Sequence, residues 1–175
     1  MPLRGARSPG HAEAGILFGA NMEDPEGAIL RAARAIAALP GFRFVDQSCL
    51  WVTEPVGGPP GQNPCRNRAA VYMCPQDPQR VVKSLLAVEA SMGRVRGERW
   101  GPRLIDIDLL YLGTLISDDE KAQVPHPRLH ERAFALYPLA DVRPGWLHPL
   151  LGKSVEDLIA ELPPGSESLV RKAPG

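Results

Sequence analysis

The order of strand-like and helix-like segments limits what this chain of 175 residues can fold into. Apolar segments of strand length alternate with two longer segments whose apolar residues recur at helical spacing. Each expected helix follows an aspartate N-cap and begins with proline, at Asp24-Pro25 and at Asp77-Pro78. The resulting order, β-α-β-β-α-β, is the ferredoxin-like pattern and predicts an antiparallel sheet covered by helices. The expected strands span residues 15–20, 42–53, 67–74 and 104–112.

Smaller elements are expected after Gly113, so the predicted fold is α+β with C-terminal helical additions. They are a strand-like piece at 114–117, helical pieces near 128–136 and a helix at about 154–162, for which Ser154 is the N-cap.

The expected domain organisation is a single domain over residues 15–165. Residues 1–14 are mostly Gly, Pro, Arg and Ala without an apolar core, so they predict a flexible N-terminal extension rather than a secretory signal. Residues 166–175 are expected to form a loose tail.

Composition and charge favour a globular protein of the cytoplasm. Hydrophobic residues make up 44% of the chain, yet no apolar run approaches the length of a membrane span. The 20 Lys and Arg residues balance 20 Asp and Glu, which argues against a nucleic-acid surface. The three cysteines, Cys49, Cys65 and Cys74, are an odd number without metal-ligand spacing. They favour a reducing compartment over a disulfide scaffold or a zinc site.

A basic stretch runs directly into a strand that carries two aspartates. Residues 93–103 contain four arginines and one glutamate, and Asp106 and Asp108 follow. Arginine binds phosphate oxygens in a planar, bidentate way, so this stretch predicts a focused anion site. Side chains alternate along a strand, so the two aspartates share one face, with Cα atoms roughly 6.5 to 7 Å apart.

Carboxylates at that spacing can bind magnesium, which in turn binds phosphates. The alternative is an outer strand face with solvated acids that pair with arginines, and a short Asp-x-Asp motif does not decide between the two.

The segment Arg-Trp-Gly-Pro-Arg-x-x-Asp-x-Asp-Leu-Leu at 99–110 resembles the signature of the 6-hydroxymethyl-7,8-dihydropterin pyrophosphokinase family. Other motifs of that family are matched in order, and the similarity runs from about Ile16 to Leu162. These motifs are Gly19-Ala20-Asn21, Thr53-Glu54-Pro55-Val56-Gly57, Asn67, and Val124-Pro125-His126 followed by Arg132 and Phe134.

The resemblance implies transfer of pyrophosphate from ATP to the hydroxymethyl group of a reduced pterin in folate biosynthesis, with release of AMP. It implies that Asp106 and Asp108 hold two magnesium ions and that Asp106 could accept the hydroxyl proton. Arg94 and Arg103 would be catalytic phosphate clamps. The full set expected to bind ATP is Glu89, Arg94, Arg96, Arg103, His126 and Arg132.

For the pterin, the resemblance implies a flat slot with aromatic walls and buried polar groups. The residues expected to bind it are Thr53, Val56, Asn67, Trp100 and Phe134, with Trp100 on a loop that closes over the site. Cys65 stands where the family usually has a second aromatic wall, and Glu54 stands where proline is common.

Two other functions stay open at this point. A different magnesium-dependent Asp-x-Asp transferase would leave the loop at 53–56, Asn67 and Phe134 without a role. A non-catalytic pterin- or nucleotide-binding relative of the enzyme would be favoured only by the change at Cys65. The expected partners are the small molecules ATP and the pterin, with no nucleic acid and no membrane, and the chain is expected to be a monomer.

Overall fold

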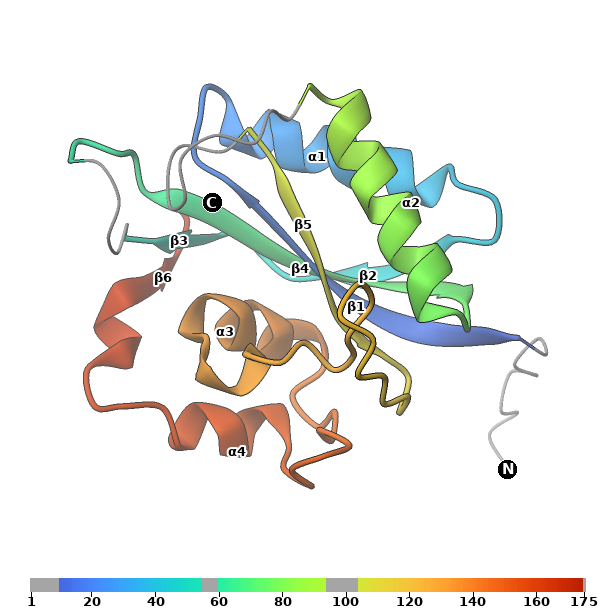
Figure 1. Ribbon diagram of the computed structural model, residues 1–175. Helices are drawn as coiled ribbons and strands as arrows, with labels where there is room; N and C mark the ends of the chain where they lie inside the picture. The colour runs from blue at the N-terminus through green and yellow to red at the C-terminus, as the bar shows by residue number, and fades with distance from the viewer. Residues whose placement is uncertain (1–9, 55–59, 94–103, 175) are drawn as a thin grey trace.

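The computed structural model describes residues 10–54, 60–93 and 104–174, in which a six-stranded antiparallel sheet forms the centre of the molecule (Figure 1). The strand order is β5-β1-β4-β3-β6, and β2 pairs with another part of β4. The strands are β1 (His11–Ala20), β2 (Arg43–Gln47), β3 (Trp51–Thr53), β4 (Cys65–Pro75), β5 (Asp106–Leu112) and β6 (Val170–Lys172).

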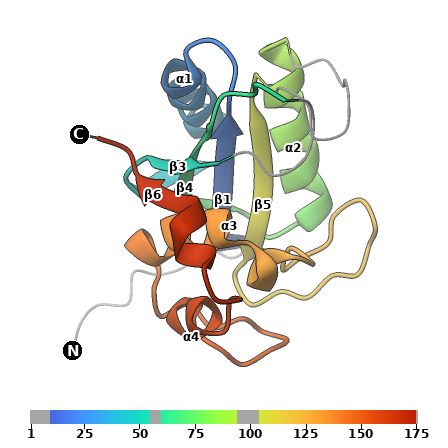
Figure 2. The ribbon, with the colours of Figure 1, turned by 90° about the vertical axis from the view of Figure 1, so that its left-hand side faces the viewer.

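Helices cover both faces of this sheet, as Figures 1 and 2 show. One face packs against α1 and α2, through a core cluster that includes Phe18, Ile29 and Leu85. The other face packs against α3 and α4, through a second cluster that includes Leu17, Leu136 and Leu158. The helices are α1 (Pro25–Ala37), α2 (Pro78–Ser91), α3 (Ala133–Val142) and α4 (Val155–Ala160), with 3-10 turns at Leu129–Glu131 and Ser166–Leu169.

The predicted α+β, ferredoxin-like architecture with C-terminal helical additions is confirmed. The caps also form as predicted: Asp24 accepts a hydrogen bond from Gly27 N, and Asp77 accepts one from Arg80 N. Ser154 caps α4 in a reciprocal capping box with Asp157. None of the helices in the described part of the chain has the length and apolar character needed to span a membrane.

Two expected strands differ from the structure. Residues 42–53 form two strands, because Ser48 interrupts the ladder: its N–H donates to Ala69 O at 2.8 Å, and its hydroxyl accepts from Ala69 N at 3.0 Å. The side-chain oxygen thus replaces a backbone partner at this position, and β2 and β3 pair with β4 on either side of the break. The piece at 114–117 forms only an isolated bridge between Ser117 and Val124.

The ends of the described chain are more ordered than expected. β1 begins at His11, opposite Pro75, so residues 11–14 belong to the sheet rather than to an extension. At the other end, β6 pairs with β3 and buries Val170. The segment 166–172 is therefore part of the fold, whereas a loose tail was expected. Three residues are too few for strand periodicity to be recognised in a sequence.

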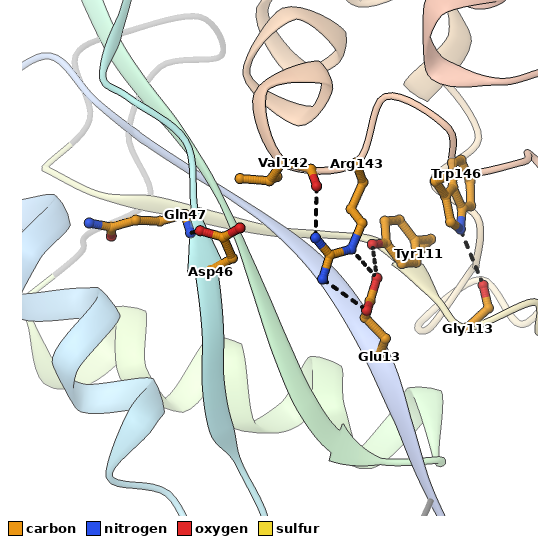
Figure 3. Close-up of polar contacts among 8 residues, drawn as sticks. All are labelled: Glu13, Asp46, Gln47, Tyr111, Gly113, Val142, Arg143 and Trp146. Carbon is orange, nitrogen blue, oxygen red and sulfur yellow. Dashed lines mark hydrogen bonds and ion pairs between the residues drawn. The ribbon is translucent and has the colours of Figure 1, made fainter. Parts of the chain in front are cut away.

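A polar network fastens the end of α3 to the sheet (Figure 3). Glu13 Oε1 accepts from Arg143 Nε at 2.9 Å and from the Tyr111 hydroxyl at 2.7 Å. Trp146 stacks on Tyr111 with ring centroids 4.4 Å apart. The Tyr111 ring occupies the space that a side chain at Gly15 would need, so this strand position requires glycine.

Candidate active site

The register of the sheet brings the predicted metal and pterin residues to one face. Gly19 of β1 lies opposite Asp106 of β5 on one side and opposite Asn67 of β4 on the other. In the next row on that face, Leu17 lies between Asp108 and Ala69. Residues directly opposite in a sheet share a face, so both aspartates and Asn67 face α3. The Cα atoms of Asp106 and Asn67 are therefore roughly 10 Å apart, two strand spacings.

Gly19 makes room at the centre of this row for the side chain of Asn67. The amide nitrogen of Asn67 lies 3.0 Å from the position that a Cβ at residue 19 would take, and Cys65 Sγ lies 3.7 Å from it. A side chain at residue 19 would displace the Asn67 amide, which is itself buried with 4% of its surface exposed. Glycine inside a strand is thus explained by the close approach of a neighbouring functional group.

Thr53 and Cys65 flank Asn67 on the same face. The Thr53 hydroxyl lies 2.9 Å from Asn67 Oδ1 and donates a hydrogen bond to it. Cys65 is the backbone partner of Thr53 in the pairing of β3 with β4. The amide of Asn67 is therefore held from one side by a hydroxyl and presented beside a small, polarizable side chain.

The beginning of α3 brings Arg132 and Phe134 to this face of the sheet. Phe134 packs against the second core cluster, whose members include Leu17 and Ala69. The Arg132 guanidinium lies over the Phe134 ring, 5.4 Å from its centroid. A cation and an aromatic ring thus sit next to the row that contains Asp108.

His126 lies on the loop that leads to α3, and its backbone is tied to the aspartate strand. Its N–H donates to Leu110 O at 2.8 Å, and its Nδ1 accepts from Arg128 N at 3.1 Å. Burial, together with the charges of Arg132 and Arg128, lowers the pKa of His126 to about 4. The neutral imidazole with Nδ1 as acceptor carries its proton on Nε2, which makes Nε2 a hydrogen-bond donor.

Glu89 lies in the last turn of α2 and is buried, with 4% of its surface exposed. Its Oε1 accepts a hydrogen bond of 2.7 Å from the backbone N–H of Ile107, the residue between Asp106 and Asp108. Glu89 is therefore a buried acid with a backbone partner, and its expected contact with ATP stays a prediction.

Five of the predicted site residues lie outside the described residues. They are Val56, Arg94, Arg96, Trp100 and Arg103, and their roles stay predictions.

The aspartate pair fits the coordination habits of magnesium. In the described part of the chain there is no group of three or more His, Cys, Asp or Glu that could hold a metal ion. Magnesium does not need such a cage, because it typically takes one or two carboxylates together with waters and the phosphates of its substrate. Two half-buried aspartates on one strand face are a donor set of that kind.

A family model described as 7,8-dihydro-6-hydroxymethylpterin-pyrophosphokinase (HPPK) matches residues 15–144. The 2-amino-4-hydroxy-6-hydroxymethyldihydropteridine pyrophosphokinase of Pseudomonas aeruginosa is 36% identical over 148 residues, which are 85% of this chain and 90% of that protein. The protein of the same name from Methylorubrum extorquens is 38% identical over 148 residues, 84% of this chain and 91% of that protein. The chain belongs to the HPPK family, so the family resemblance and the enzyme class expected from the sequence are confirmed.

Solved structures share the fold. The wild-type HPPK-DHPS of Plasmodium falciparum superposes with a TM-score of 0.65 at 13% identity, over 86% of this chain and 44% of that chain. The same protein with pterin and p-hydroxybenzoate gives a TM-score of 0.66 at 14% identity, over 89% of this chain and 42% of that chain. This chain thus spans less than half the length of those proteins, and the similarity concerns the fold alone.

Sequence reasoning missed three features of the site. Gly19 was part of a recognised motif, but its role in making room for Asn67 was not inferred, although a glycine inside a strand signals a close approach. The hydrogen bonds between Glu89 and Ile107 and between His126 and Leu110 depend on tertiary packing, so no local sequence pattern predicts them.

Proposed function

We propose that this chain carries out the reaction of its family, the transfer of pyrophosphate from ATP to 6-hydroxymethyl-7,8-dihydropterin, with two magnesium ions held by Asp106 and Asp108. The observation that supports this assignment is the row Asp106–Gly19–Asn67. This row holds a carboxylate and an amide on one face, with a glycine between them. In the proposal the carboxylate binds metal-bound phosphate and the amide binds the heterocycle.

The pterin lies on the Asn67 side of this row. The Asn67 amide, oriented by the Thr53 hydroxyl, hydrogen-bonds the edge of the pterin ring, and Phe134 forms one wall of the slot. Val56 and Trp100 complete the slot in this proposal. Pairing of buried polar groups carries specificity, because a ligand that leaves such a group without a partner costs about 1 to 3 kcal/mol.

ATP lies on the side of Asp106 and Asp108. His126 donates from Nε2 and Arg132 pairs with phosphate oxygens, joined by Arg94, Arg96 and Arg103 from the basic stretch. Glu89, which accepts from Ile107 N between the two aspartates, is the acid of this ATP site. A neutral histidine close to the charges of Arg128 and Arg132 suits a phosphate site, because anionic oxygens prefer donors and cations.

In the reaction, the pterin hydroxymethyl oxygen attacks the β-phosphorus of ATP and the bond from that phosphorus to the bridging α,β-oxygen breaks. AMP leaves with this oxygen, and the β- and γ-phosphoryl groups remain on the pterin. The hydroxyl proton passes to a base, for which Asp106 is the candidate. Magnesium, when bound, neutralises charge on the phosphate oxygens and lowers the pKa of a coordinated hydroxyl.

Product analysis tests the proposal. The protein is incubated with ATP, magnesium and 6-hydroxymethyl-7,8-dihydropterin, and nucleotides are separated by chromatography. We expect AMP in equal amount to pterin diphosphate, and no product with EDTA. ADP with a monophosphorylated pterin, or transfer to a sugar instead, would assign a different Asp-x-Asp transferase. Tight pterin binding without turnover would assign a non-catalytic relative.

The proposal includes a monomer in the cytoplasm. Free thiols at Cys49, Cys65 and Cys74 suit a reducing compartment. Sedimentation at micromolar concentration tests the oligomeric state.

A further inference from the structure

The aspartate strand is an edge strand. β5 stands at one end of the strand order and pairs only with β1 in the described part of the chain. The N–H and C=O groups along its other side are not covered by a ladder. Edge strands of this kind lack half of the backbone bonds that fix a central strand.

Two contacts replace the missing ladder on that side. Glu89 Oε1 accepts from Ile107 N at 2.7 Å, and the backbone N–H of His126 donates to Leu110 O at 2.8 Å. The first contact acts between the two aspartates, since Ile107 separates Asp106 from Asp108. It comes from α2, in which Leu85 and Val88 are buried in the core. The packing of these residues fixes the position of the Glu89 backbone.

We infer that Glu89 is a positioning residue for the magnesium carboxylates: its carboxylate holds the open edge of β5 at Ile107 and thereby fixes the spacing and direction of Asp106 and Asp108. This inference rests on the proposed metal role of that pair. Two like charges one residue apart on an edge strand repel each other, and the repulsion favours local separation of the strand from the sheet. A charge-assisted hydrogen bond to the backbone between them opposes that separation.

A volume-matched pair of variants separates the hydrogen bond from packing. Glu89→Gln keeps an oxygen that can accept from Ile107 N, whereas Glu89→Met fills similar space without one. Val81→Ala, a buried position earlier on the same helix, is the control for a general loss of stability. All four proteins, wild type included, are studied as full chains.

Amide hydrogen exchange in the metal-free protein is the first measurement. We expect Ile107 to exchange roughly tenfold to a hundredfold faster in Glu89→Met than in Glu89→Gln, because the Gln amide oxygen still accepts from Ile107 N whereas Met leaves this donor without an acceptor. In Val81→Ala, any acceleration is expected to be shared by other sheet amides rather than confined to Ile107.

The second measurement is the magnesium concentration needed for half-maximal binding of a non-hydrolysable ATP analogue, by calorimetry. We expect Glu89→Met to need about tenfold more magnesium than Glu89→Gln, with little difference between the two when magnesium is absent. The inference is overturned if Ile107 exchange is the same in both variants, or if it differs while the magnesium requirement does not. It is also overturned if Gln is as impaired as Met, since the charge of Glu89 would then act directly on the ligands.

The product assay on the wild-type protein separates this inference from the proposed function. Formation of AMP by the wild type, together with equal behaviour of Gln and Met, rejects only the role of Glu89. No AMP and no magnesium-dependent binding by the wild type rejects the proposed function, whatever the exchange of Ile107 shows.

Discussion

The Thr53 hydroxyl and the Asn67 amide oxygen lie 2.9 Å apart on two paired strands, and this contact orients the group that we expect to read the pterin edge. Thr53→Val removes the hydroxyl and keeps the shape of the side chain. We expect pterin affinity to fall by about tenfold, because the buried amide loses its orienting donor. Calorimetric titration with the pterin measures this, and ATP-analogue affinity should stay the same.

Thr53→Ser is the matched control, since it keeps the hydroxyl and should bind the pterin nearly as well as the wild type. Equal pterin affinity in the Val and Ser variants would show that Asn67 does not depend on Thr53.

Asp108→Ala should abolish catalysis without loss of the fold. AMP formation is expected to fall by at least about a hundredfold, since a metal ligand contributes several kcal/mol to stabilising charge in the transition state. Thermal unfolding without magnesium should be unchanged or shifted upward, because one of two repelling carboxylates is gone. Asp118→Ala, an exposed aspartate in a loop, is the control and should match the wild type. A large loss of metal-free stability with normal turnover would make the aspartates structural.

Cys65→Tyr should tighten pterin binding. The register places residue 65 on the face of Asn67, so an aromatic ring there can stack on the ligand. Such stacking contributes about 0.5 to 1.5 kcal/mol, which is up to roughly tenfold in affinity. Calorimetry with pterin and ATP analogue is the measurement, and Cys65→Ala serves as the comparison for loss of bulk. Weaker pterin binding in the tyrosine variant would mean that the wall is already filled.

Acid should weaken the fold through His126. Its folded-state pKa of about 4 lies below the usual value of 6.5, so the unfolded chain binds more protons between these two values. The contribution of His126 to the free energy of unfolding should therefore be fully present above about pH 6.5, and the free energy of unfolding should decrease as the pH falls towards 4. Urea unfolding at several pH values measures this slope. In His126→Gln the slope over that window should be shallower. An identical slope in the two proteins would show that folding does not lower the pKa of His126.

Arg143→Met should lower stability without lowering activity. Arg143 joins Glu13 and, through it, Tyr111, so its loss removes charge-assisted bonds from a half-buried network (Figure 3). We expect a decrease of about 1 to 3 kcal/mol in the free energy of unfolding. Lys153→Met breaks the exposed pair with Glu161 and should cost less than about 1 kcal/mol. Equal losses in the two variants would contradict a special role of the network.

The local patterns predicted the fold well because they are read within single elements. Asp24-Pro25, Asp77-Pro78 and Ser154 each carry the chemistry of a helix start, and each caps a helix in the structure. The alternation of apolar residues around Asp106 and Asp108 likewise predicted that the aspartates share a face.

What could not be predicted depends on partners that are distant in the sequence. The break at Ser48 is set by Ala69, and the order of residues 170–172 is set by β3. The contact of Glu89 with Ile107 is also invisible in the sequence of α2, where Glu89 is simply the single acid, near the C-terminal end. To predict side-chain hydrogen bonds between two elements, one needs the register and the packing of both elements, and a single sequence gives neither.

The pairing of β3 with β6 has a consequence for the order in which this site is completed during synthesis. The strand of Thr53 can pair with β4 as soon as β4 has been made, but the neighbour on its other side, β6, follows β5, α3 and α4 in the chain. Until residues 170–172 arrive, Thr53 stands on an open edge while Asp106 and Asp108 already have their partner in β1. The proposed metal side of the site is therefore paired before α3 and α4 are made, whereas the proposed pterin side gains its last neighbouring strand only after them.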